Sequence, residues 1–230
     1  MNDIITVSNL SKRYGRNIVF DNLSFALPRG RVIGLLGENG IGKTTLLRLM
    51  ADILKPDSGV MAIDGQIISR HTRDKVSFLL EPVNLYRFMQ VKDAIQFYKD
   101  FFDDFDYKKA IMLCEEFKLG LSRRVEFLSK GNQERLCLLL SLSRNASVFL
   151  LDEPLAGLDP KIKRDFVMTI LANIVEKASM VIASHLIRDL QSIFDDIVIL
   201  KKNEVVMAPA EDIRAQGKSV EDYYLEVIER

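Results

Sequence analysis

The chain has 230 residues, enough for one large domain or two small ones with a full hydrophobic core. Its 32 basic residues balance its 32 acidic residues and the two signs are interspersed, which excludes a charge footprint for nucleic acid or an anionic membrane. The cysteines, Cys114 and Cys137, lie in apolar helical patterns without metal-ligand spacing, as reduced structural thiols do. No apolar run approaches the ~18 residues of a membrane span, and the first ten residues lack an export-leader pattern. We therefore expect a cytoplasmic chain.

The predicted strands fall into two classes. Alternation of apolar and polar residues predicts a half-buried antiparallel hairpin from DIITVSNLSKRY (3–14) and RNIVFDNLSFALPRG (16–30). Later runs are almost continuously apolar and rich in Val, Ile and Leu, which is typical of strands covered on both faces in a parallel sheet. These runs are RVIGLLG (31–37), SVFLLDEP (147–154), MVIASH (180–185) and DIVILKKNEVVM (196–207).

Helical patterns lie between the predicted strands and alternate with them, which favours an α/β core with an antiparallel portion at the front. The predicted helices are 43–53, 93–102, 107–117, 131–143 and 161–177. Consecutive helices interrupt the alternation, so we interpret residues 83–144 as an inserted helical subdomain. The catalytic core would then comprise 1–82 and 145–210, and residues 211–230 would form a separate charged helical tail.

The segment GLLGENGIGKTTLLRLM contains the phosphate-loop pattern, carried by Gly37, Gly42, Lys43 and Thr44. Glycines allow backbone N–H groups to turn inward around phosphate oxygens, and the start of the following helix adds its positive dipole end. Lys43 can neutralise the β and γ phosphates of a nucleotide, Thr44 can ligate Mg²⁺ and Thr45 can reach the α phosphate. A plain glycine-rich turn would not require the strand before this pattern or the amphipathic helix after it.

The segment SVFLLDEPLAGLD places Asp152 and Glu153 at the end of a buried strand, where open α/β sheets bind ligands. Asp152 would hold Mg²⁺ through water, and Glu153 could polarise an attacking water as general base. The alternative is a strand-terminal acidic turn before Pro154. A phosphate loop in the same chain favours the catalytic interpretation.

This arrangement of motifs resembles the ATP-binding subunits of ABC transporters, which have a P-loop NTPase fold with a RecA-like parallel sheet. The segment LSKGNQERL, between the phosphate loop and the acidic strand, is similar to the signature of that family, normally written LSGGQ; Ser129 and Gly131 match it. The family uses this helix start to grasp the γ phosphate held by a partner subunit, which implies a dimer of identical or paralogous chains. An N-cap Ser129 before a buried helix is also physically sound, and both roles can hold at once.

Further residues match family landmarks. Tyr14 stands where the family stacks an aromatic ring on adenine, and Asp159 ends the AGLD segment, which matches the loop that communicates between the two ATP sites. His185 matches the switch histidine that contacts the γ phosphate and helps to position the water. Residues 55–66 match the hairpin that follows the phosphate-loop helix in this family. The resemblance implies ATP and Mg²⁺ as cofactors, with Glu153, His185 and Lys43 catalytic and with Thr44, Glu81 and Asp152 at the metal. The implied nucleotide-binding residues are Tyr14, Gly37, Glu38, Asn39, Gly40, Ile41, Gly42, Lys43, Thr44, Thr45, Ser129, Lys130, Gly131, Asn132, Gln133 and Asp159.

The sequence departs from the family in two places. In SFLLEPVNLYRFM, Glu81 occupies the position of a glutamine that senses Mg²⁺ and the membrane partner. In the signature, Lys130 and Asn132 replace the third and fifth residues, and such substitutions resemble the export-type branch of bacterial ABC systems. A carboxylate can still approach Mg²⁺. We expect a competent ATPase. How the loop at Glu81 couples hydrolysis to the membrane partner is left open by the sequence.

The segment 83–107 is the predicted partner-facing surface. Its apolar stripe at helical spacing is usually core, yet the apolar loop from Tyr86 to Met89 has little reason to be exposed unless a partner docks there. We expect separate transmembrane subunits and a location on the inner face of the membrane. The alternatives are a soluble ABC ATPase in an assembly role and a regulatory module that closes on ATP without turnover.

Overall fold

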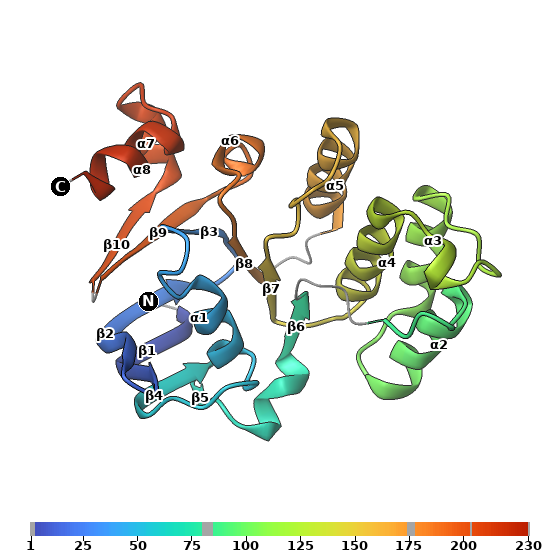
Figure 1. Ribbon diagram of the computed structural model, residues 1–230, viewed down its shortest axis with the longest axis horizontal. Coiled ribbons are helices and arrows are strands. Elements are labelled where there is room, and N and C mark those ends of the chain that lie inside the picture. Colours follow the sequence, from blue (N-terminus) through green and yellow to red (C-terminus); the bar gives the residue numbers. More distant parts are fainter. Residues whose placement is uncertain (1–2, 80–84, 174–177, 203, 230) are drawn as a thin grey trace.

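Two sheets organise the computed structural model, which describes residues 3–79, 85–173, 178–202 and 204–229 (Figure 1). Within these residues, the antiparallel sheet has the order β2 (Asn17–Pro28), β1 (Asp3–Tyr14), β4 (Ser58–Ile63), β5 (Gln66–Ile67). The larger sheet has the order β10 (Glu204–Pro209), β9 (Asp196–Lys201), β3 (Val32–Leu36), β8 (Ser179–Ala183), β7 (Val148–Asp152), β6 (Val76–Leu79), and its strands from β9 to β6 are parallel. The predicted α/β fold, with an antiparallel front, is confirmed.

The helices follow the strands of the larger sheet and an inserted block. They are α1 (Lys43–Met50), α2 (Val91–Phe101), α3 (Tyr107–Glu116), α4 (Lys130–Leu142), α5 (Pro160–Asn173), α6 (Ile187–Leu190), α7 (Ala210–Ala215) and α8 (Val220–Ile228), with 3-10 turns η1 (Arg70–Lys75) and η2 (Val125–Phe127). Each predicted helix is present, with ends that differ by at most three residues where they are described. Residues 174–177, predicted as the end of a helix, lie outside the described residues.

Alternate side chains of the central strands enter two different cores. Ile33 and Leu35 of β3 pack with α1 and the antiparallel sheet, whereas Val32 and Leu36 face the core formed with the other helices. Since both faces are covered, the parallel strands are almost entirely buried. This packing fixes the carboxyl ends of β3, β7 and β8 next to one another, which is where the motif residues lie.

Helices α2, α3 and α4 lie together beside the β6 edge of the sheet (Figure 1). Helix α4 contacts β6 through a buried pair of hydroxyls, because Ser77 Oγ lies 2.8 Å from Ser141 Oγ. The short edge strand β6 was not predicted, since Val76–Leu79 is too brief to show a period. Its pairing with β7 is what brings the inserted helices against the sheet.

The prediction for residues 196–207 was wrong in one respect. We expected one run within the parallel sheet, whereas β9 is parallel to β3 and β10 turns back to pair antiparallel with β9. Strand β10 has exposed residues along its length, as suits an edge strand, and the charged Lys201 and Lys202 mark where the apolar run ends.

The C-terminal segment, predicted as a charged helical tail, forms α7 and α8 and packs against the core. Ala210, Ile213, Val220 and Val227 are buried and belong to the larger hydrophobic core. The charged residues of this segment occupy the outer faces of α7 and α8. These helices are short and rich in charged residues. Their few apolar positions therefore do not form a pattern from which this packing could be predicted.

Candidate nucleotide-binding site

The phosphate loop joins the end of β3 to the start of α1. Gly40 and Gly42 have φ values of 82° and 115°, a backbone region that side chains other than glycine rarely adopt. A Cβ at Gly42 would lie 2.7 Å from Cγ1 of Val19, so β2 also leaves no space there. Glu38, Asn39 and Gly40 form the exposed tip of the loop. Backbone N–H groups in such a turn, followed by a helix start, suit a phosphate group.

Lys43 is held inside this loop. Its side chain is buried, and Nζ donates hydrogen bonds to the carbonyl oxygens of Gly37 and Glu38 at 2.7 and 3.2 Å. Burial lowers the pKa of Lys43, while the nearby carboxylates of Glu153 and Asp152 act in the opposite direction. The ammonium group therefore lies among the loop carbonyls, with two acidic residues close by.

Thr44 and Asp152 meet although they are far apart in the sequence. Thr44 Oγ1 donates a hydrogen bond of 3.1 Å to Asp152 Oδ1, which joins the first turn of α1 to the end of β7. Burial raises the pKa of Asp152, and the Thr44 hydrogen bond opposes that rise. One hydroxyl and one carboxylate in contact fit Mg²⁺, which commonly takes one or two protein oxygens together with substrate phosphates. No cluster of three or more metal-ligating side chains occurs among the described residues, so a cage made by protein alone is not indicated there.

Glu153 and His185 are paired at the adjacent strand end. His185 Nδ1 lies 2.8 Å from Glu153 Oε2, and the His185 backbone N–H donates to both carboxylate oxygens at 3.1 and 3.2 Å. Glu153 has a left-handed backbone with φ 47°, which turns the chain sharply after β7. The two residues meet because β7 and β8 are neighbours, with Asp152 opposite Ala183.

Ser184 also belongs to this cluster, and sequence reasoning missed it. Its hydroxyl is buried and donates a hydrogen bond of 3.1 Å to Glu153 Oε2. The signal was the polar pair Ser184 and His185 at the end of an apolar run. Without the strand order, nothing in the sequence indicates that the serine faces the glutamate.

A cavity of about 170 Å³ lies between the phosphate loop and the loop that carries His185. Glu38 and Asn39 line one side, Ser184 and His185 line another, and Tyr224 of α8 contributes a further wall. Tyr224 was not predicted as a site residue. Its helix comes from the segment that the sequence presented as a charged tail.

The signature residues lie elsewhere, at the start of α4. Ser129 is the exposed N-cap, and its hydroxyl accepts a hydrogen bond of 3.4 Å from the backbone N–H of Asn132. Gln133 is directed inward, because its Nε2 donates to the carbonyl oxygens of Val125 and Leu128 at 3.2 and 3.1 Å. None of the described residues that line the small cavity belongs to 129–133.

The signature contacts the AGLD loop of its own chain. Lys130 Nζ donates to the carbonyl oxygen of Ala156 at 3.5 Å and lies against Gly157. Gly131 packs close to Ile162, so a Cβ at this position would meet Ile162 Cδ1 at 2.8 Å. Asp159, at the end of the same loop, is exposed. The structure thus joins the signature and the AGLD loop into one surface.

The remaining predicted residues that the structure describes lie outside the cluster formed by Lys43, Asp152, Glu153 and His185. Tyr14 ends β1 with 47 % of its surface exposed, and Lys12 Nζ lies 5.7 Å from the centre of its ring. Ile41 and Thr45 are half-buried in the phosphate loop and the first turn of α1. Glu81, predicted at the metal, lies outside the described residues.

Comparisons with known proteins identify the family of the chain. Residues 20–156 match the family model for ABC transporters. The ABC transporter ATP-binding protein YtrB of Bacillus subtilis is 30% identical over 205 residues, which cover 88% of this chain and 70% of that protein. The ribose import ATP-binding protein RbsA of Caldanaerobacter subterraneus is 31% identical over 215 residues, which cover 87% of this chain but 43% of that protein.

A solved structure described as an ATP-binding subunit of an ABC transporter superposes with a TM-score of 0.87, covering 98% of this chain and 99% of the other. Its sequence identity is 22%, so this likeness concerns the fold. The family match extends over more than half of the chain and includes both the phosphate loop and the acidic strand end. The chain therefore belongs to the ABC transporter family, as an ATP-binding domain with the ATPase activity that energises transport.

Proposed function

We propose that this ATPase works as one of two subunits that power export through separate transmembrane subunits. The convergence of Lys43, Thr44, Asp152, Glu153 and His185 at one edge of the sheet carries the proposal. Export is supported by the signature, in which Lys130 and Asn132 resemble the export-type branch. Because the relatives include a ribose import protein, sequence similarity leaves the direction to experiment.

Each of the converging groups has a chemical task. Lys43 would neutralise the β and γ phosphates of ATP, with Thr45 at the α phosphate and Tyr14 stacked on adenine. Thr44 and Asp152 would hold Mg²⁺, which when bound offsets the charge of the phosphates. Glu153 would accept a proton from the attacking water as the bond between the γ phosphate and ADP breaks.

The family resemblance implies that His185 contacts the γ phosphate and helps to position the attacking water. Its contacts in this chain support a second role, in which it positions Glu153. Its backbone N–H and its ring Nδ1 both lie within hydrogen-bond distance of the Glu153 carboxylate, and Ser184 adds a third donor. Three contacts restrict the carboxylate to one orientation. A base held in this way can act on a water without first reorganising.

The signature would complete the site of a second chain. Ser129 is exposed at the start of α4, while the phosphate loop lies on another part of the molecule (Figure 1). We propose that residues 129–133 and Asp159 of one chain meet the ATP that is bound at residues 37–45 of the other. Residues 1–82 with 145–210 would then be the catalytic unit, and 83–144 the unit that presents the signature.

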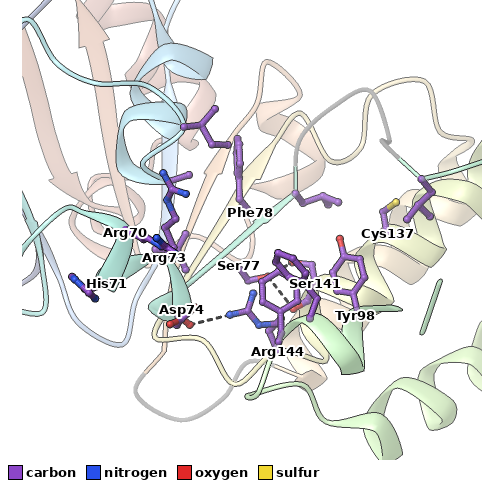
Figure 2. Close-up of a pocket in the computed structure, with 17 residues that line it drawn as sticks. Arg70, His71, Arg73, Asp74, Ser77, Phe78, Tyr98, Cys137, Ser141 and Arg144 are labelled. Atoms are coloured by element: carbon purple, nitrogen blue, oxygen red, sulfur yellow. Dashed lines mark hydrogen bonds between the residues drawn. The ribbon is translucent and has the colours of Figure 1, made fainter. Parts of the chain in front are cut away.

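The surface for the membrane partner would be a cavity of about 930 Å³ between β6 and η1 on one side and α2 and α4 on the other (Figure 2). Its apolar lining includes Phe78, Tyr98 and Phe102, and Arg70 and Arg73 also line it. This composition fits a short apolar segment that carries acidic groups. Among the described residues, no helix is long and apolar enough to cross a membrane.

A cluster of exposed aromatic side chains lies beside this cavity. Phe88 and Phe101 are 68% and 69% exposed, and Tyr86 lies 5.6 Å from Phe88 and 6.5 Å from Phe97 between ring centres. Large exposed aromatic groups next to a cavity are typical of docking sites. We propose that separate transmembrane subunits dock here and hold the chain at the inner face of the membrane.

Size-exclusion chromatography of Glu153→Gln, with and without Mg²⁺ and ATP, tests the dimer. The slowed turnover should retain ATP, so ATP should convert a monomer to a dimer, and Ser129→Arg added to this variant should abolish the conversion. If ATP binds while the chain stays monomeric in both variants, the homodimer is wrong. Transport of a labelled cargo by the reconstituted complex in oriented vesicles then determines the direction.

A further inference from the structure

Helix α8 contributes to the nucleotide site although it lies near the far end of the chain. Tyr224 lines the same cavity as Glu38 and Asn39 of the phosphate loop and as His185. The ring is half-buried and also packs against the larger core. A residue of the C-terminal helix thus lines the same cavity as two loops that the proposed hydrolysis depends on.

Both ends of α8 are anchored, which fixes the place of Tyr224. At the start, the Val220 N–H donates to Gln191 Oε1 at 3.2 Å, and the side chain of Ser219 caps the helix. At the end, Lys201 Nζ donates to the carbonyl oxygen of Val227 at 2.9 Å. Val220 and Val227 are buried in the core. Helix α8 is therefore held by hydrogen bonds to Lys201 of β9 and to Gln191, and by its two buried valines.

Helix α8 is also linked to the loop after β8. Arg188 pairs with Glu221, and Arg188 follows His185 by three residues. Lys163 of α5 pairs in turn with Asp189 at 2.7 Å. These ion pairs connect the loop after β8, which carries His185, to the helix that carries Tyr224 and to α5.

We propose that Tyr224 is a positioning residue of the ATP site, whose ring keeps the Glu38–Asn39 tip of the phosphate loop in register with the His185 loop. The C-terminal helix would thereby set the affinity for ATP and not merely cover the core. This inference rests on the proposed function, because it assigns a further residue to the same site. Burial raises the pKa of the Tyr224 hydroxyl and Glu38 adds to the rise, so the ring stays uncharged beside that carboxylate at neutral pH.

The test compares Tyr224→Ala with Tyr224→Phe and with Tyr223→Ala in the full chain. Tyr223 is the matched control, since it is half-buried on the same helix and packs against the same core but does not line the cavity. Equilibrium titration with Mg²⁺ and ATP gives the Kd, phosphate release gives kcat and KM, and urea unfolding without nucleotide gives stability. We expect the Kd and KM of Tyr224→Ala to rise about tenfold, with a smaller change in kcat, because misplaced loops weaken binding of the phosphates.

Tyr224→Phe should remain within about twofold of the wild type, because the ring and not the hydroxyl does the positioning. Equal Kd values for Tyr224→Ala and Tyr223→Ala, or a Tyr224→Phe loss as large as that of Tyr224→Ala, would overturn the inference. If Tyr224→Ala does not fold, Tyr224→Leu keeps apolar packing without the reach of the ring and should show the same rise in Kd.

The same measurements separate this inference from the proposed function. A wild-type chain that binds ATP but releases no phosphate contradicts the proposed hydrolysis, while the order of the Kd values still decides the role of Tyr224. A wild-type chain that binds no ATP overturns both.

Discussion

The phosphate-loop region and the signature region differ in how far each is completed by its own chain. In the first, Lys43, Thr44 and Asp152 come from α1 and β7 and already contact one another or the loop. In the second, Ser129 is exposed at the start of α4, and the neighbouring Lys130 contacts Ala156 of the AGLD loop. Sheet topology brings the residues of the phosphate-loop region together within one chain. The signature region is instead an exposed surface of the chain.

The contrast between the two regions indicates where a partner is needed. Parallel strands with buried faces bring their carboxyl ends together without outside help, so the catalytic groups are organised within one chain. A helix start that is exposed can satisfy an anion only when that anion is brought to it. Changes in the first region should therefore act within the chain, and changes in the second should act through the dimer.

The largest effect should come from Glu153→Gln. Loss of the carboxylate removes the proposed base, and phosphate release should fall by about 10² to 10⁴-fold while ATP still binds. His185→Ala should lower release in the same direction but less, because Ser184 still orients the carboxylate. Single-turnover phosphate release and ATP titration measure both. A Glu153→Gln chain that retains wild-type turnover would disprove the assignment of the base.

Mixing two inactive variants tests the comparison between the regions directly. In a dimer of Glu153→Gln with Ser129→Arg, both defects fall on one ATP site and the other site is intact. Combining the chains at equal amounts before adding ATP should restore phosphate release that neither variant shows alone, since each mixed dimer has one intact site. If no ratio restores activity, the signature does not serve the partner.

The sequence was sufficient for the phosphate loop because the motif is local, with its strand and helix adjacent to it. It also predicted Asp152 and Glu153, since a buried run that ends in two carboxylates is visible without the fold. It could not place Ser184 or Tyr224. Their roles depend on the adjacency of β7 and β8 and on the packing of α8, and neither is local in sequence.

The edge strands were predicted least well, for a related reason. β6 has four residues and β10 follows β9 without a strong turn signal, so the periodicity of each is too short or too continuous to assign. Only the pairing of these strands with β7 and β9 defines them. The C-terminal helices resemble them in this respect, because the apolar residues that pack them are few.

Asp152→Asn should stabilise the folded chain, because it removes a buried carboxylate from the phosphate-loop region. Burial raises the pKa of Asp152, so the ionised carboxylate destabilises the folded chain at neutral pH, and this cost is relieved as the pH falls through the raised pKa. The asparagine oxygen can still accept from Thr44. We expect the free energy of unfolding to increase by about 1 kcal/mol at pH 7, a usual size for a stabilising change at a functional site.

The gain should shrink as the pH falls through the raised pKa of Asp152, where the wild-type carboxyl becomes protonated. Urea unfolding without nucleotide at several pH values measures this. Asp165→Asn is a suitable comparison, because that carboxylate is more exposed and pairs with Arg135. A pH-independent difference for Asp152→Asn would contradict the role of burial, and an unchanged requirement for Mg²⁺ would contradict the metal assignment.

The smallest effect should be that of Lys130→Ala, and it distinguishes a surface residue from a structural one. Lys130 is the first residue of α4, where a cation is unfavourable to the helix dipole, and this cost opposes its contacts with Ala156 and Glu134. The free energy of unfolding should therefore change by no more than about 0.5 kcal/mol. The same cation would favour a partner's phosphates, so the ATP concentration for half-maximal dimer formation should rise about threefold, and less at high salt. Lys92→Ala, an exposed lysine of α2, should change neither quantity. If Lys130→Ala destabilises the chain but leaves dimer formation unchanged, Lys130 serves the AGLD loop of its own chain and not the partner.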